Sequence, residues 1–162
     1  MDEWLARTAE LVEKYDPDTF YFDWWIKQRE FQPYIKRFAA FYYHKAAKRG
    51  TDAMLETKET AFPGGASVFD VERGQLTDIW SLDWQTDTSV SNQSWGYIKH
   101  DSLKSPESIV SELVGIVSKN GNLLLNIGPR SDGMIPEDVR RILLSVGKGL
   151  DANSEAIYGT RP

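Results

Sequence analysis

Apolar residues recur at helical spacing in four stretches of the chain, which predicts four amphipathic helices. The first ends at Asp16-Pro17-Asp18, the second at Gly50, and the third and fourth begin at Ser105-Pro106 and Pro136. The predicted buried stripes are Trp4, Leu5, Thr8, Leu11, Val12 and Tyr15; Ile35, Phe38, Ala39, Tyr42 and Ala46; Ile109, Val110, Leu113, Ile116 and Val117; and Val139, Ile142, Leu143, Val146 and Leu150.

Short apolar and aromatic runs between these helices predict strands. They cover Thr19 to Trp24, a short strand that begins at Ala53 to Leu55, Ser67 to Val71 and Leu123 to Leu125, while residues 74–104 are loop-rich. Alternating helices and strands predict an α/β fold of about four βα units with a parallel sheet. A complete eight-stranded barrel takes roughly 250 residues, so the pattern leaves open a compact open sheet or one part of a barrel.

Composition narrows the class of protein. The chain has 162 residues, which predicts one domain over 1–162, with 41% apolar and 27% charged residues as in ordinary globular proteins. No apolar run approaches the roughly 20 residues of a membrane helix, and a net charge of -5 without a basic stripe argues against nucleic acid. The absence of cysteine excludes disulfides and thiolate metal sites. The N-terminal residues lack the features of a signal peptide, and the compartment stays open.

Two carboxylates follow predicted strands, where barrel enzymes place catalytic groups. Asp23 lies in Tyr21-Phe22-Asp23-Trp24-Trp25, and Glu72 lies in Phe69-Asp70-Val71-Glu72-Arg73-Gly74. A barrel can bring two such groups to about 5 to 5.5 Å, the separation of a retaining glycosidase pair. Alternatively, Asp23 caps a turn and Glu72 forms a surface pair with Arg73. Glu56 and Glu59 are rival acids.

Aromatic and short polar side chains alternate in the loop-rich segment, around Trp84 and again at Ser94-Trp95-Gly96-Tyr97. This combination suits a hydroxylated ring, although a polar loop packed on two tryptophans gives the same pattern. His44 and His100 lack metal-ligand spacing and are interpreted as structural, so no metal site is predicted. Asn126 to Gly133 is interpreted as a tight turn after a strand rather than as an anion-binding loop.

Taken together, these segments resemble glycoside hydrolase family 29, the α-L-fucosidases. The resemblance rests on Tyr21 to Trp25, Phe69 to Gly74, Trp84-Gln85-Thr86 with Ser94 to Tyr97, and Asn120 to Pro129, and it extends to the ending Glu155 to Thr160. It implies a partial (β/α)8 TIM-like barrel, roughly its second half. It also implies a retaining hydrolase of terminal α-L-fucosyl linkages in glycans, with no cofactor.

The resemblance assigns roles to particular residues. Asp23 matches the family's nucleophile and Glu72 best matches its acid/base, while Trp24, Trp95 and Tyr97 would shape the sugar pocket. The partner is then a fucosylated oligosaccharide or glycoconjugate, and the family suggests a periplasmic or extracellular location.

The chain departs from the family before Asp23, where the histidine-rich segment that contacts fucose has no counterpart. A partial barrel exposes strand edges, which predicts self-association or a missing N-terminal half. Three readings follow: an active fucosidase, an inactive fragment or fucose-binding module, and a barrel glycosidase of another specificity.

Overall fold

The computed structural model describes residues 1–160 and divides into two compact units. The first unit comprises Met1–Asp70, and the second begins at Val71. The strand order is β1-β2-β3-β4-β5, and strand β3 (Val68–Glu72) contains the boundary between the units. Among the described residues, no helix is long and apolar enough to cross a membrane.

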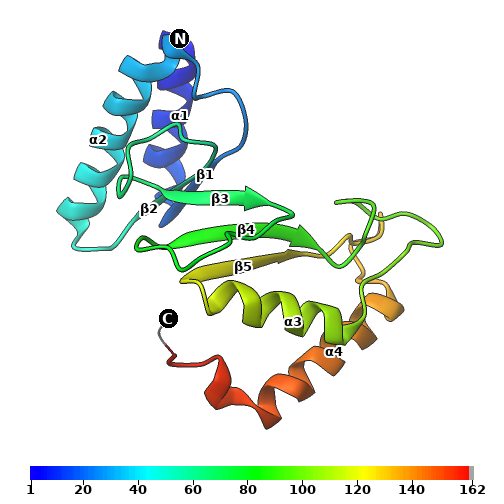
Figure 1. Cartoon of the computed structure of the whole chain (residues 1–162). Coiled ribbons are helices and arrows are strands. Elements are labelled where there is room, and N and C mark those ends of the chain that lie inside the picture. Colours follow the sequence, from blue (N-terminus) through cyan, green and yellow to red (C-terminus); the bar gives the residue numbers. More distant parts are fainter. Residues whose placement is uncertain (161–162) are drawn as a thin grey trace. The chain divides into compact units, whose positions relative to one another are not determined.

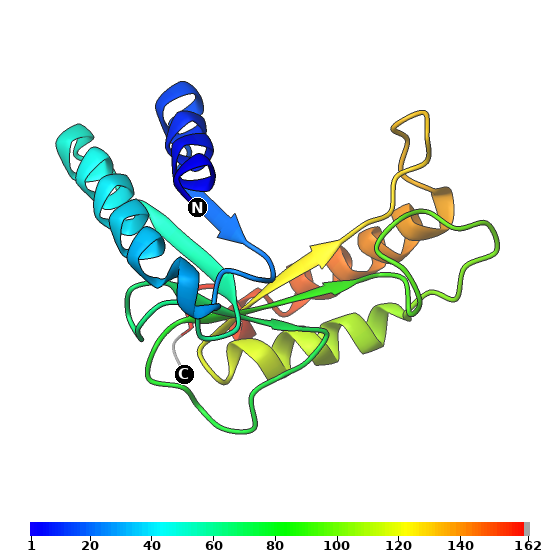
Figure 2. The ribbon, with the colours of Figure 1, turned by 90° about the horizontal axis from the view of Figure 1, so that it is seen from above.

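The first unit contains two helices and the first three strands. Its elements are α1 (Asp2–Tyr15), β1 (Thr19–Phe22), a 3-10 turn η1 (Arg29–Phe31), α2 (Gln32–Arg49), β2 (Met54–Lys58) and the start of β3. Strands β1 and β2 are parallel, with Phe22 opposite Thr57, and β2 and β3 are parallel, with Lys58 opposite Asp70. Helices α1 and α2 lie side by side in both views (Figures 1 and 2).

An aromatic core joins α1 and α2 to β1. Phe38 of α2 is fully buried, with the rings of Phe20, Phe22 and Tyr42 at 5.0, 5.2 and 6.0 Å. The stripe predicted for α2 is confirmed at Ile35, Phe38, Tyr42 and Ala46, which are all buried.

The stripe predicted for α1 was too wide. Thr8 and Val12 are buried and Trp4 packs against the core, but Leu11 and Tyr15 are exposed. A helix that packs along one narrow line leaves the edges of its apolar stripe in water.

The second unit contains two more helices against two strands. Its elements are β4 (Trp84–Ser89), α3 (Pro106–Val117), β5 (Gly121–Asn126), α4 (Glu137–Ala152) and a 3-10 turn η2 (Ser154–Ala156). Strands β4 and β5 are parallel, and Trp84 lies opposite Gly121. Helix α3 runs along β5 and packs against α4 (Figure 1), and Val90, Ile109, Val139 and Val146 form the core.

Strand β4 lies within residues 74–104, where the sequence predicted a loop-rich segment and no strand. Its sequence, Trp-Gln-Thr-Asp-Thr-Ser, has one apolar residue, so it shows neither an apolar run nor apolar alternation. Five of its six residues are nevertheless buried. Neighbours bond to several of these side chains: Thr86 donates to the Val71 carbonyl at 2.6 Å, and Thr88 accepts from Lys104 at 2.8 Å. Polar residues can therefore form a buried strand when tertiary partners accept their hydrogen bonds.

Gly121 begins β5 beneath the buried ring of Trp84. A Cβ at this position would lie 2.5 Å from Trp84 Cε2 and 2.8 Å from Ile116 Cγ2, and the Trp84 ring is fixed because its Nε1 donates to the Lys119 carbonyl at 2.8 Å. We expect Gly121→Ala to lower the free energy of unfolding by about 1–3 kcal/mol through overpacking. Urea denaturation followed by circular dichroism measures this change.

Gly147→Ala in α4 is the matched control. No atom lies within 4 Å of a Cβ built there, and alanine favours a helix interior over glycine by about 0.5–1 kcal/mol. The two substitutions should therefore change stability in opposite directions. A Gly121→Ala variant as stable as the parent protein would contradict the close packing of Trp84 on β5.

Candidate active site

Asp23 directly follows β1, at its carboxyl end. Its side chain is 60% exposed, and Oδ1 lies 3.4 Å from Nζ of Lys58, whose side chain is only 8% exposed. Lys58 is the last residue of β2, and the parallel register sets Phe22 opposite Thr57, so the two side chains meet one residue further along. A buried ammonium group is costly unless a counter-charge faces it, and Asp23 supplies one.

Two tryptophans follow Asp23 where the backbone leaves the strand. The predicted strand extended to Trp24, but β1 ends at Phe22 and the chain turns, with Trp25 at a φ of 84°. The Lys58 ammonium lies over the Trp24 ring, 5.5 Å from its centroid. One cation therefore contacts both the Asp23 carboxylate and the Trp24 ring.

Tyr21 and Asp70 connect the two outer strands of the first unit. The Tyr21 hydroxyl donates to Asp70 Oδ2 at 3.0 Å, and Asp70 is buried in β3. Sequence reasoning named neither Asp70 nor Lys58 as a site residue. Alternation along β2 could have found Lys58, because it shares a strand face with Glu56, and charged residues at both positions are unusual for an apolar core.

The rival acids occupy different environments. Glu56 is buried within β2, whereas Glu59 follows that strand and forms an ion pair with Lys27. Glu72 is the last residue of β3 and is exposed. Of the three, only Glu72 combines the end of a strand with an exposed side chain.

Arg73 follows Glu72 with a φ of 47° and directs its side chain to the loop after β4. Its guanidinium lies 4.2 Å from the centroid of the Trp95 ring, and Nη1 donates to the Ser91 carbonyl at 3.1 Å. Arg73 therefore positions Trp95 by stacking.

The segment that carries Trp95 and Tyr97 is held from two sides. Ser91 Oγ accepts from the backbone of Gln93 and Ser94 at 3.0 and 2.9 Å, and Asn126 Nδ2 donates to the Trp95 carbonyl at 2.7 Å. Both aromatic rings remain substantially exposed. Ser91 and Asn126 thus fix the backbone of the loop that carries these two rings.

The turn after β5 supports the same loop. A Cβ on Gly128 would lie 2.8 Å from the Tyr97 backbone nitrogen, so only glycine allows this close approach. The Met134 amide and the Arg130 guanidinium both donate to the Asp132 carboxylate. Both bonds lower the pKa of Asp132, and the bond from Met134 has the larger effect. Within the predicted segment Asn126 to Gly133, Asn126 still belongs to β5, and the tight turn lies at its end, where the Gly133 amide donates to the Arg130 carbonyl at 2.9 Å.

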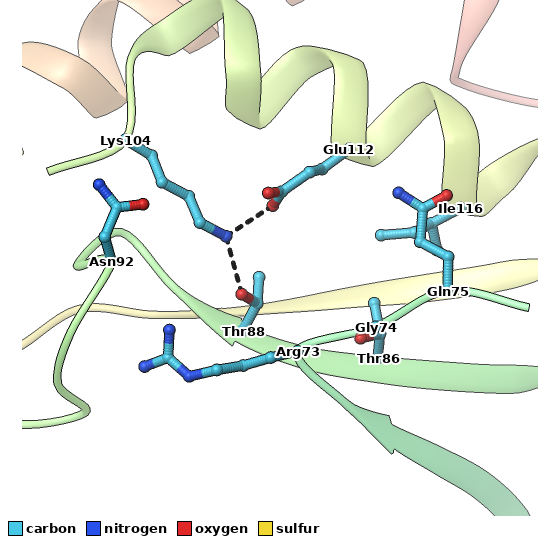
Figure 3. Close-up of a pocket in the computed structure, with 9 residues that line it drawn as sticks. All are labelled: Arg73, Gly74, Gln75, Thr86, Thr88, Asn92, Lys104, Glu112 and Ile116. Carbon is cyan, nitrogen blue, oxygen red and sulfur yellow. Dashed lines mark hydrogen bonds and ion pairs between the residues drawn. The ribbon is translucent and has the colours of Figure 1, made fainter.

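A polar pocket of about 270 Å³ lies between β4 and α3, on the helix side of the strand (Figure 3). At its centre the Lys104 ammonium donates to Thr88 Oγ1 and to Glu112 Oε2, both at 2.8 Å. Through Lys104, these two bonds join Thr88 of β4 to Glu112 of α3, and they hold the helix over the polar residues of the strand.

The histidines do not form a metal site with their neighbours. Within residues 1–160, no group of three or more histidine, aspartate or glutamate side chains could hold a metal ion. His44 lies within α2, and His100 lies in the loop after Tyr97 with a φ of 59°.

The predicted site residues divide between the units. Asp23 and Trp24 lie in the first unit, joined through Lys58, and Glu72, Trp95 and Tyr97 lie in the second. Arg73 connects the end of β3 to Trp95 within the second unit.

Comparison with known proteins identifies the same family along nearly the whole chain. The sequence model of the family described as alpha-L-fucosidase matches residues 1–155. Tissue alpha-L-fucosidase of Homo sapiens is 46% identical over 82 residues, which are 49% of this chain and 18% of that protein. Plasma alpha-L-fucosidase of Rattus norvegicus is 30% identical over 164 residues, covering 96% of this chain and 35% of the relative.

Solved structures agree in fold. One described as alpha-L-fucosidase superposes with a TM-score of 0.80 at 30% identity, covering 98% of this chain and 35% of the other. The Thermotoga maritima alpha-fucosidase in complex with fucose gives 0.76 at 29% identity, covering 98% and 35%. The predicted partial TIM-like barrel is thereby confirmed, and this chain spans between about a fifth and about a third of these relatives.

Proposed function

Because the chain belongs to the α-L-fucosidase family, we propose that it carries the catalytic carboxylates of a retaining α-L-fucosidase. The substrate is a glycan with a terminal α-L-fucosyl group. The observation that supports this most directly is Asp23 at the end of β1, exposed to an incoming ligand and in contact with the buried Lys58. A barrel enzyme places its reacting groups at this end of its strands.

In the first step Asp23 is the nucleophile. Its carboxylate oxygen bonds to the anomeric carbon of fucose while the bond from that carbon to the leaving oxygen breaks. Lys58 orients the carboxylate through the contact at Oδ1, which leaves the rest of the group exposed for attack. The product of this step is a covalent fucosyl ester on Asp23.

Glu72 is the proposed acid/base. It protonates the leaving oxygen in the first step and then removes a proton from water, whose oxygen attacks the anomeric carbon and releases L-fucose and the Asp23 carboxylate. Its exposed place at the end of β3 favours Glu72 over Glu56, which is buried, and over Glu59, whose side chain is only 23% exposed.

Aromatic rings complete the proposed sugar site. Trp24, Trp95 and Tyr97 are all substantially exposed, and Asn126 holds the Trp95 backbone through its carbonyl. Exposed rings of this kind bind the apolar faces of a sugar, and nearby polar groups bind its hydroxyls. The proposed mechanism requires no cofactor.

The test is hydrolysis of 4-nitrophenyl α-L-fucoside by the purified chain, with the 4-nitrophenyl β-D-galactoside as specificity control. Proton NMR of the first sugar released should show the α-anomer, because two displacements retain configuration. Faster cleavage of the galactoside would indicate another specificity. Fucose binding without turnover would identify a binding module, and a folded chain that neither binds nor cleaves would refute the proposal.

A further inference from the structure

The polar pocket between β4 and α3 has no part in the proposed mechanism. It measures about 270 Å³, and every residue that lines it belongs to the second unit (Figure 3). Apart from Ile116, its lining side chains are polar or charged. Polar groups that are withdrawn from water need hydrogen-bond partners, so the hollow favours a small polar ligand over an apolar one.

The pocket lies beside a connection that has no helix. Residues 73–83 link β3 to β4 as a loop. In a βα repeat a helix usually makes this connection and packs apolar side chains on the sheet. Here the helix side of β4 instead presents Thr86 and Thr88 to the hollow beside α3. The polar lining is therefore not part of an apolar core between strand and helix.

Lys104 brings a positive charge into this pocket. Its side chain is only 11% exposed, and its ammonium donates to Thr88 Oγ1 and to Glu112 Oε2, both at 2.8 Å. An ammonium group has three N–H donors. Among residues 1–160 these two bonds are its only hydrogen bonds, so one N–H is left for a group outside the protein.

Arg73 brings a second positive charge. The face of its guanidinium contacts the Trp95 ring at 4.2 Å, and Nη1 donates to the Ser91 carbonyl at 3.1 Å. A guanidinium has five N–H donors in one plane. The ring contact uses the face and the carbonyl uses one donor, so the edge of the group keeps donors for the pocket that Arg73 lines.

The lining carries an excess of positive charge. Arg73 and Lys104 are cations, and Glu112 is the one carboxylate among the lining residues. The amide of Asn92 lies at the same pocket. In Figure 3, Arg73, Asn92 and Lys104 extend toward one end of the hollow, and Gln75 and Ile116 toward the other. Convergent N–H donors with an excess positive charge suit an oxyanion.

We propose that this pocket binds a small oxyanion, a carboxylate or a phosphate, between Lys104 and Arg73. Its oxygens accept from the third N–H of Lys104 and from the edge of the Arg73 guanidinium, and both bonds are charge-assisted. A neutral ligand would leave the excess positive charge without a counter-charge. The inference does not depend on the proposed function, because no step of that mechanism uses this pocket.

Arg73 connects the pocket to the loop after β4. An oxyanion bonded to the guanidinium restrains the group that stacks on Trp95 and donates to the Ser91 carbonyl. Occupancy of the pocket should therefore be visible at the Trp95 ring, and the readout needs no turnover of any substrate.

The experiment is a titration of the whole chain followed by NMR of the indole N–H groups. Sodium phosphate and sodium acetate are added separately near neutral pH, with sodium chloride keeping the ionic strength constant. The Trp95 resonance, identified by its absence in Trp95→Phe, should shift and saturate, whereas neutral glycerol should not move it. A response to phosphate alone would assign a phosphate site, a response to acetate alone a carboxylate site, and a response to both the shared oxyanion chemistry.

Two substitutions at the pocket should change the affinity in opposite directions. Asn92→Asp adds a carboxylate to the lining and should weaken phosphate binding by about tenfold through repulsion. Glu112→Gln removes a negative charge, although its amide oxygen can still accept from Lys104, and it should strengthen binding by about the same factor.

Asn122→Asp is the matched control for the added charge. Asn122 is also exposed, but it lies on β5 opposite Gln85, whose side chain points to the face of the sheet opposite that of Thr86 and Thr88. This variant should bind phosphate as the parent chain does.

Stability separates binding from folding. Phosphate stabilises proteins in general, and this part of its effect should be equal in Asn92→Asp and Asn122→Asp. Binding to the folded chain adds a further increase in the urea midpoint, which should occur in Asn122→Asp and be largely lost in Asn92→Asp. Equal midpoint increases in both variants would overturn the inference. So would a Trp95 resonance that moves with neither anion, or that moves equally with glycerol.

Discussion

Asp23→Asn is expected to abolish fucoside hydrolysis, reducing kcat/KM by about 10⁴-fold or more, as found when a catalytic nucleophile is removed. The amide is neutral and cannot form the ester intermediate. Stability should hardly change, because the side chain is mostly exposed and an asparagine oxygen can still accept from Lys58. Steady-state rates with an aryl fucoside and a thermal melt measure the two effects.

Asp16→Asn is the matched control for this substitution. Asp16 is also an exposed aspartate in an ion pair, with Arg49, and its φ of 51° is one that asparagine tolerates. It should keep full activity. A second test uses Asp23→Gly with sodium azide, because a small anion in the vacated space can attack the anomeric carbon and yield a fucosyl azide. Retained activity in Asp23→Asn would transfer the role of nucleophile to another residue.

Phe38→Ala is expected to reduce the free energy of unfolding by about 3–5 kcal/mol, the cost of removing a fully buried phenylalanine. The ring lies within 5.2 Å of both Phe20 and Phe22, so its loss leaves a cavity against the strand that carries Asp23. Urea denaturation followed by circular dichroism gives the value. Activity should fall with the folded fraction, because β1 positions Asp23.

Leu11→Ala provides the comparison on the neighbouring helix. Leu11 belongs to the apolar stripe predicted for α1 but is 46% exposed, so its truncation should change stability by less than about 0.5 kcal/mol. A similar loss of stability in Leu11→Ala and Phe38→Ala would contradict the exposed position of Leu11 on α1.

The sequence by itself determined most of the helices and indicated the family. Helical periodicity and terminal signals found α2, α3 and α4, because an apolar stripe, a proline at the start and a glycine or asparagine at the end are local properties of the chain. The motif around Asp23 indicated a carboxylate at the end of a strand, and the comparisons support the family that this motif suggested.

Tertiary structure decided the features that depend on partners distant in sequence. Strand β4 forms from polar residues because neighbouring backbone and side chains satisfy them, so its sequence carries no apolar signal. Lys58 meets Asp23 because parallel pairing of β1 with β2 aligns their ends, and no local pattern encodes that register. The left-handed backbone of Trp25 likewise lies where the next residue, Ile26, enters the core. This packing, rather than any preference of tryptophan, leaves the Trp25 ring exposed.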